Sequence, residues 1–388
     1  MFGTHLGRGR GKIVAVADIG SGSAAVAILA LHPRAPATVL AATRAILPIE
    51  ERTQEALIAG IGEQLVKAAG EAQKQYAAMN PKGVKPVRAL YCIIRAPWSR
   101  SQTALSGTAF KEETTITEQM VSGLAQQAIA TVKELDPQNF FETSVTRVEL
   151  NGYPTGEPIG KRAREIRIST LVSDCNPRIR AEVESSLQSV FPHLSPVFRS
   201  STRALVSVLR ELPQRERDYF IVDMASEGTS LIAVRDGVPA EHISISEGVR
   251  TILNRISDTG LPEETLSLIR MLAREECSTT ACETIQRSLG LLEPELVRVF
   301  GEAMSTCAKE MRLPNALLLI AHPDVSPWLS KFFSRIDFAQ FTMTTQPFIV
   351  GTIDIPDLAH LVKPHNGVAR DSALALGCAL VNMEENRA

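Results

Sequence analysis

The chain has 388 residues, of which 44% are hydrophobic and 22% charged, a balance typical of globular proteins and not of disordered chains. Its 41 basic and 43 acidic residues give a net charge of −2, and aromatic residues make up only 5%. Such a chain lacks the basic field and the stacking surface that nucleic-acid binding needs, so we expect no nucleic-acid partner. At roughly 100–200 residues per domain, the length predicts two to four structural units.

The cysteines and the apolar segments indicate in which cellular compartment the protein is expected. Only Cys277 and Cys282 lie close together among six cysteines, and no second pair or nearby histidine completes a zinc pattern. We therefore expect reduced, buried thiols and no metal held by cysteine. No apolar run approaches the roughly 20 residues of a spanning helix, and Asp18 interrupts the first one. The sequence predicts a cytoplasmic protein without its own transmembrane anchor.

The N-terminal part begins with a short apolar strand, residues 13–17, that ends in the polar segment Asp18–Ser23. A second apolar run, residues 24–31, completes a hairpin, and residues 39–47 are a candidate third strand. From about residue 53 to 79, apolar residues recur at spacings of three and four, which indicates an amphipathic helix.

Residues 85–174 have the size of a small domain and the order strand, helix, strand, strand. Its expected elements are a strand at 87–94, a polar stretch at 99–115, a helix at 117–135, and strands at 145–150 and 163–172.

The second half repeats the first. A strand runs into Asp223, and a polar turn and a second strand follow, as they do after Asp18. We infer two related lobes with a cleft between them. The other expected elements are helices at 177–190, 201–211 and 371–381, a mostly helical stretch at 249–313, and strands at 231–234, 240–246, 317–320 and 348–355.

Each of the two turns has a chemical interpretation. In Asp18–Ser23, Gly20 and Gly22 permit a tight turn whose backbone N–H groups, with Ser21 and Ser23, can cradle a phosphate, and Asp18 can hold hydrated Mg²⁺. The alternative is an ordinary polar hairpin tip.

The turn after Asp223 departs further from a phosphate loop. It retains Gly228 and Thr229, but Glu227 would repel a phosphate unless a metal lay between them. A hairpin that keeps its shape without a ligand is the alternative there.

These motifs, in this order, resemble the actin-like ATPase superfamily. Asp18–Ser23 is similar to the first phosphate loop and Asp223–Ser230 to the second, while Glu247-Gly248 corresponds to a Gly-Gly pair before a helix. Ala321-His322 stands where the family has the Gly-Gly of its adenosine loop.

Within the superfamily, the chain most resembles the bacterial cell-division protein FtsA and, second, the type IV pilus assembly protein PilM. The inserted unit and its stretch ending in Pro158-Ile159-Gly160 carry this resemblance. It implies an α/β, actin-like (ribonuclease H-like) duplicated two-lobe fold. The implied domains are a first lobe at 11–84, 175–212 and 345–388, an inserted domain at 85–174, and a second lobe at 213–344 with a helical subdomain at about 256–309.

The resemblance also implies an ATP and Mg²⁺ site. Asp18 and Asp223 would hold Mg²⁺ through water, and Glu247 is a weak candidate to orient the attacking water. The implied phosphate-binding residues are Asp18, Gly20, Ser21, Gly22, Ser23, Asp223, Gly228, Thr229 and Gly248, and Ala321 and His322 would form the adenosine loop.

The departures from the family pattern predict weak or lost ATP binding. Ala24 and Ala25 stand where the family often has a basic residue, and Ala225, Ser226 and Glu227 replace three glycines. Side chains at former glycines fill the space through which backbone would approach the nucleotide. If the protein is an enzyme, it is an ATPase, but the degenerate loops favour a pseudo-ATPase.

The functional expectation is a cytoplasmic, FtsA-like scaffold for division-ring assembly that binds protein partners. A PilM-like component of a pilus platform and an ATP-switched, filament-forming ATPase are alternatives, and a sugar kinase is the weakest. The segment 381–388 is short and acidic and lacks the basic amphipathic character of a lipid-binding helix. We therefore expect partners to recruit the protein to the inner face of the membrane, with Arg8, Arg10 and Lys12 as a weak alternative contact.

Overall fold

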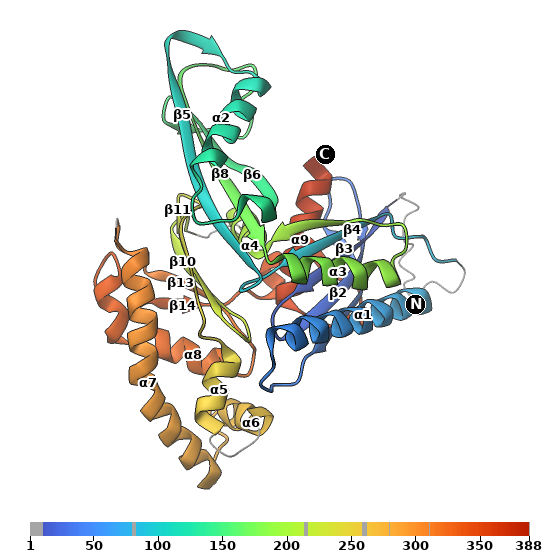
Figure 1. Ribbon diagram of the computed structural model, residues 1–388, viewed down its shortest axis with the longest axis vertical. Helices are drawn as coiled ribbons and strands as arrows, with labels where there is room; N and C mark the ends of the chain where they lie inside the picture. Colours follow the sequence, from blue (N-terminus) through green and yellow to red (C-terminus); the bar gives the residue numbers. More distant parts are fainter. Residues whose placement is uncertain are drawn as a thin grey trace, which may run out of the picture.

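The computed structural model describes residues 11–79, 83–212, 216–257, 262–278, 280–309 and 311–387 (Figure 1). The described residues form three sheets, two of which are the centres of two lobes, while the third belongs to an inserted domain. Arg8 and Arg10, two of the three basic residues of the weak alternative membrane contact, lie outside the described residues.

The first lobe is built on a six-stranded sheet. The hairpin expected around Asp18 is present, and its strands are almost wholly buried because helices cover both faces. The strands in spatial order are β15 (Val362–Pro364), β3 (Ala37–Ile46), β2 (Ser23–Leu31), β1 (Lys12–Ile19), β4 (Ala89–Ile94) and β9 (Pro196–Ser200).

The second lobe contains a five-stranded sheet of the same design. In both sheets the first three strands along the chain are antiparallel neighbours, and the fourth strand runs parallel to the first. The strands in spatial order are β12 (Val238–Ile245), β11 (Thr229–Arg235), β10 (Tyr219–Met224), β13 (Ala316–Ile320) and β14 (Ile349–Gly351).

The two hairpin turns are equivalent down to their hydrogen bonds. Gly20 N–H donates to Ser23 O over 3.0 Å, and Ala225 N–H donates to Gly228 O over 2.8 Å. Gly20 and Ala225 each lie two residues after the leading aspartate of their turn. The duplication predicted from the sequence is therefore confirmed at the level of local geometry.

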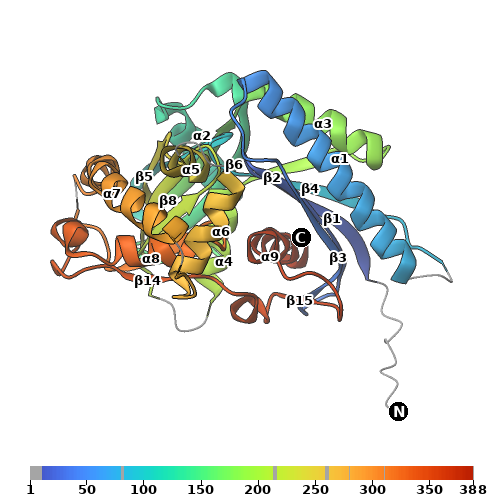
Figure 2. The same cartoon turned by 90° about the horizontal axis from the view of Figure 1, so that it is seen from below.

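Helices form layers on either side of the sheets. Helices α4 and α9 lie between the two lobes, where side chains of both sheets join one continuous hydrophobic core (Figure 2). Helices α1 and α3 cover the outer face of the first sheet, and α5, α7 and α8 that of the second. Their bounds are α1 (Gln54–Met79), α3 (Pro177–Val190), α4 (Ser201–Glu211), α5 (Val249–Ser257), α6 (Pro262–Ala273), α7 (Thr280–Cys307), α8 (Ser326–Phe333) and α9 (Ser372–Arg387).

The inserted domain has the predicted order of elements but a different first strand. Ala89–Ile94, expected to open the insert, pairs with β1 of the first lobe instead. The polar stretch 99–115, to which the sequence assigned no strand, is the 17-residue strand β5 (Ser99–Thr115), which pairs with β8 along most of its length. The sheet order is β5–β8 (Arg162–Cys175)–β6 (Phe140–Leu150)–β7 (Tyr153–Pro154), and α2 (Glu118–Thr131) packs on it (Figure 1).

One pair of cysteines corrects an expectation. Cys277 and Cys282 form a disulfide, because the connection from α6 to α7 brings their Cα atoms to 6.0 Å, within the range that a disulfide spans. The four other cysteines are buried free thiols, as expected: Cys92, Cys175, Cys307 and Cys378.

The acidic C-terminal segment is docked on the first lobe. Glu384 pairs with Arg199 and Arg203, and Glu385 pairs with Lys12, the third basic residue of the weak alternative membrane contact. Among the described residues, no helix is long and apolar enough to cross a membrane.

Candidate functional site

The candidate site lies where the two duplicated hairpins face each other. Asp18 is near the end of β1 and Asp223 near the end of β10, and both side chains are only 2% exposed. Burying a carboxylate is costly unless a partner compensates its charge. The partners of these two aspartates therefore decide what the site can bind.

Arg95 joins the two lobes at this point. It directly follows β4 of the first lobe, and its guanidinium hydrogen-bonds the Asp223 carboxylate in the second lobe. The same guanidinium lies 3.7 Å from Asp18 Oδ2. The charges of these carboxylates raise the pKa of Arg95 despite its burial, which alone would lower it. Arg95 thus stands between the two acids proposed to hold Mg²⁺.

Arg44, on β3, supplies a second cation. Its Nη2 lies 2.8 Å from Asp18 Oδ2, its Nε lies 2.6 Å from Asp371 Oδ2, and its Nη1 lies 2.7 Å from Ser23 Oγ. Burial alone would raise the pKa of Asp371, but the hydrogen bond and charge of Arg44 outweigh it and hold this pKa below its usual value. Four side chains from separate strands and a helix terminus thus form one network with Arg95 and Asp223.

The two turns are in direct contact. The backbone N–H of Glu227 donates to Ser21 Oγ over 3.0 Å. A Cβ built on Gly22 would lie 2.7 Å from the Cβ of Ser226, which is closer than side-chain carbon atoms approach. The space in which a phosphate would lie between the loops is therefore filled by the loops themselves.

In the second turn, groups that could bind an anion are hydrogen-bonded within the chain. The first N–H groups of α5 could bind a phosphate, but Val249 N–H donates to Ala225 O and Arg250 N–H to Ser226 O, each over 3.0 Å. The guanidinium of Arg250 forms two hydrogen bonds of 2.7 Å with the carboxylate of Glu227. The repulsive charge noted at Glu227 is thus neutralised by a side chain of the same chain, without a metal.

The remaining residues of the second turn serve its packing. Thr229 Oγ1 donates to Glu247 O over 2.6 Å, and Gly228 and Gly248 lie where any Cβ would meet backbone atoms within 3 Å. Glu247, the weak catalytic candidate, is 4% exposed, accepts a hydrogen bond of 2.6 Å from Thr251 and is paired with Arg255. Its carboxylate is thus bound by side chains of the following helix, α5, an arrangement that does not suit a general base.

Ala321 and His322 follow β13 directly and lead into α8, as the comparison with an adenosine loop implied. His322 Nδ1 accepts a hydrogen bond of 3.3 Å from Asp324 N–H, and burial lowers the pKa of His322 although Asp324 opposes the shift. A neutral imidazole that closes a strand-to-helix turn explains this geometry without a ligand.

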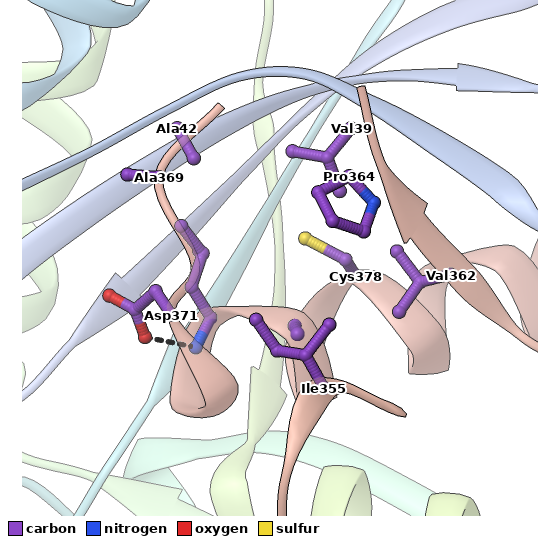
Figure 3. Close-up of a pocket in the computed structure, with 10 residues that line it drawn as sticks. Val39, Ala42, Ile355, Val362, Pro364, Ala369, Asp371 and Cys378 are labelled. Atoms are coloured by element: carbon purple, nitrogen blue, oxygen red, sulfur yellow. Dashed lines mark hydrogen bonds between the residues drawn. The ribbon is translucent and has the colours of Figure 1, made fainter. Parts of the chain in front are cut away.

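A small cavity adjoins the network at Asp371. Its volume is about 20 Å³, and aliphatic side chains of β3, β15 and α9 and the thiol of Cys378 line it (Figure 3). This volume admits about one water molecule. Among the described residues, no group of three or more His, Cys, Asp or Glu side chains could hold a metal ion. Because Arg44 and Arg95 already pair with Asp18 and Asp223, and because the two turns touch, the residues present do not fit Mg²⁺ and a polyphosphate.

The structure brings together nearly all the predicted phosphate-loop residues, but the sequence analysis missed the two arginines that control them. A signal was present for each. Arg95 ends an apolar strand parallel to β1, and Arg44 is the one charged residue in a strand otherwise made of aliphatic residues and threonines. Charged residues at such positions face the same end of the sheet as Asp18.

Comparisons with known proteins address the fold. No protein-family model and no curated protein matches the sequence. Among solved structures, the PilM–PilN type IV pilus biogenesis complex is similar at 15% identity and a TM-score of 0.56, covering 95% of this chain and 98% of the matched one.

Two further structures are more distant. The ethanolamine utilization protein EutJ from Carboxydothermus hydrogenoformans has 10% identity, coverages of 95% and 89%, and a TM-score of 0.43. A Bacteroides thetaiotaomicron protein described as having an actin-like ATPase fold has 9% identity, coverages of 88% and 91%, and a TM-score of 0.37. The duplicated sheets and the end-to-end match to PilM lead to one conclusion: the chain has the actin-like two-lobe fold, with an inserted domain.

Proposed function

We propose that this protein is an actin-fold scaffold whose interlobe cleft is held closed by its own ion pairs rather than by Mg²⁺ and ATP. The observation that carries the proposal is the position of Arg95, which is bonded to Asp223 of one lobe and lies close to Asp18 of the other. Nucleotide binding joins the lobes of an actin-type ATPase, and here side chains make that connection permanently.

The charges support this proposal. Arg44 and Arg95 together carry two positive charges, the charge of one divalent cation, and guanidinium groups stay protonated at any pH at which the protein is folded. A magnesium ion in the same place would lie against both guanidinium groups. Mutual repulsion and the loss of the existing hydrogen bonds would both oppose its binding.

The cellular setting is a finer proposal. The similarity to PilM in its complex with PilN favours a role as a cytoplasmic component of a pilus-type platform, recruited to the inner face of the membrane by a protein partner. The division-ring role that we expected first rests on the inserted domain and on the stretch that ends in Pro158-Ile159-Gly160. A fluorescent fusion at native expression level distinguishes the two, because a division scaffold forms a midcell ring.

The alternative of an ATP-switched, filament-forming ATPase requires a different state of the site. The contact between Ser21 and Glu227 would have to open, and both arginines would have to leave their aspartates. Each step exposes or isolates a buried charge, and ATP binding would have to supply the free energy that these steps cost.

Calorimetric titration and thermal unfolding with ATP and Mg²⁺ test the proposal. A ligand at about 100 times its Kd stabilises a folded protein by about 2.7 kcal/mol, so specific binding could not escape detection at millimolar ATP. We expect neither saturable heat nor a shift of Tm. Micromolar binding that EDTA and the substitution Asp18→Asn both abolish would overturn the proposal.

A further inference from the structure

A groove of about 950 Å³ lies between the inserted domain and the second lobe, away from the candidate site. The two walls of the groove, strands β5 and β12, touch at one end. There His242 Nδ1 on β12 lies 2.9 Å from the carbonyl oxygen of Ser101 on β5, and His242 Nε2 lies 3.0 Å from Ser230 Oγ. Beyond this junction the groove is lined by residues 103 and 105–109 of β5 and residues 238–241 of β12. Residues of β6, β8 and β11 and two residues at and beyond the end of α7 also line it.

Both walls are edge strands. Strand β5 has a partner on one side only, β8, and β12 likewise pairs only with β11 within its sheet. An edge strand presents unpaired backbone N–H and C=O groups, which can form a ladder with another extended chain. Natural proteins usually protect such an edge with charges, proline or a bulge.

The part of β5 that lines the groove has none of these protections. Residues 103–109 read Thr-Ala-Leu-Ser-Gly-Thr-Ala and contain neither a charge nor a proline. In contrast, residues 110–113 read Phe-Lys-Glu-Glu and coincide with a register shift in the pairing with β8. The opposite wall, β12, is protected by Pro239 and Glu241. Of the two edge strands that line the groove, only residues 103–109 of β5 are therefore open to strand addition.

The side chains of the groove add an apolar contact. Leu105 lies opposite Ser169 in the β5–β8 ladder and is 72% exposed, although its neighbour Ala104 is buried under α2. Across the groove, Met311 just beyond α7 is 59% exposed. An exposed leucine and an exposed methionine on facing walls suit an apolar side chain inserted between them.

The charges at the floor of the groove are largely paired with each other. Arg147 lies 2.6 Å from Glu149, and Arg167 lies 2.6 Å from Glu165. The floor therefore presents no net field that would select a strongly charged ligand, and backbone pairing with apolar contacts is left to provide the affinity.

From these features we infer that the groove binds one extended segment of a partner protein, which adds as a strand to residues 103–109 of β5. The segment alternates apolar and polar residues, because successive side chains of a strand face opposite sides and one side meets Leu105 and Met311. A second folded copy does not fit, since its edge strand would bring a whole sheet into the wall formed by β12 and the residues beyond α7. The inference rests on the proposed scaffold role only for the existence of a protein partner.

The probe for this site is a displayed library of random twelve-residue peptides, panned on the full-length protein. Enriched peptides are synthesised with a fluorophore, and their Kd is measured by anisotropy. The test variants are Leu105→Glu and Met311→Arg, one on each wall. Leu291→Glu is the matched control, because Leu291 is 77% exposed on α7 and does not line the groove.

We expect peptides with alternating apolar residues whose Kd rises at least tenfold in both test variants and is unchanged in Leu291→Glu. Hydrogen exchange should slow at residues 103–109 when the peptide binds. Unchanged affinity in Leu105→Glu, protection confined to other segments, or a library without binders would overturn the inference. Self-association of the wild type that Leu105→Glu abolishes would assign the groove to a second copy. None of these measurements involves nucleotide, so their results support or contradict the peptide site independently of whether the cleft is closed as proposed.

Discussion

Arg95 is the residue on which the properties of the cleft depend. Its side chain is 13% exposed and serves two aspartates that are each 2% exposed. A buried ion pair of this kind adds little net stability compared with apolar packing, but removal of one partner leaves the other charge isolated.

This reasoning predicts the effect of Arg95→Met. The variant leaves Asp223 buried without its cation, so the free energy of unfolding in urea should fall by about 3–5 kcal/mol. Arg298→Met is the control, because it breaks an exposed pair with Glu302 and should have almost no effect. Equal, small losses in both variants would show that Arg95 does not hold the lobes together.

His242 predicts a pH dependence. Burial lowers the pKa of His242, although its hydrogen bond to Ser101 O opposes this shift. Since the unfolded chain binds this proton near pH 6.5 and the folded chain does not, stability is retained above about pH 6.5 and falls as the pH decreases below it.

His242→Asn should therefore reduce the loss of unfolding free energy between about pH 6.5 and pH 5, a range set by the ordinary histidine pKa. His322, whose pKa is also lowered, accounts for part of the pH dependence of the unfolding free energy that remains in this variant. If urea unfolding shows that His242→Asn and the wild type lose the same unfolding free energy between these two pH values, the histidine is not buried in neutral form.

At the scale of the elements, the contact between the two hairpin turns is the most specific packing in the site. Gly22 has no room for a Cβ beside Ser226. We expect Gly22→Ala to lower the free energy of unfolding by about 1–3 kcal/mol, the usual cost of overpacking.

The matched test is Gly22→Ala combined with Ser226→Gly. The second substitution removes the Cβ and Oγ that the new methyl group would meet, so it should restore much of the lost stability. Additive losses in the double variant, measured by urea unfolding, would indicate that the two turns do not touch.

Helices and strands with a strong apolar pattern could be predicted from the sequence. Strands whose conformation depends on pairing with a segment distant in sequence could not. The hairpins around Asp18 and Asp223 follow from continuous apolar runs that end in polar turns, and α1 follows from apolar residues at spacings of three and four. Strand β5 was missed because its sequence is polar and its conformation depends on pairing with β8, distant in sequence. The phosphate-loop residues of the site could be located, but the arginines that neutralise them come from β3 and from the end of β4.

At the scale of the whole molecule, one hydrophobic core joins the lobes. Residues of both sheets pack against α4 and α9 in a single cluster, so the two halves are not independent units. The ion pair of Arg95 with Asp223 also joins the lobes, Arg44 holds Asp18 and Asp371 within the first lobe, and the acidic C-terminal segment is tied to the first lobe. Closure of this kind suits a scaffold with a constant surface.

The distance between the lobes tests this account most directly. Spin labels at Lys67→Cys on α1 and Leu291→Cys on α7 lie on exposed positions of opposite lobes, and pulsed electron paramagnetic resonance measures their separation. We predict one narrow distance distribution that is identical with and without millimolar ATP and Mg²⁺. A broad distribution that ATP narrows to a shorter distance would contradict a cleft closed by the protein's own arginines.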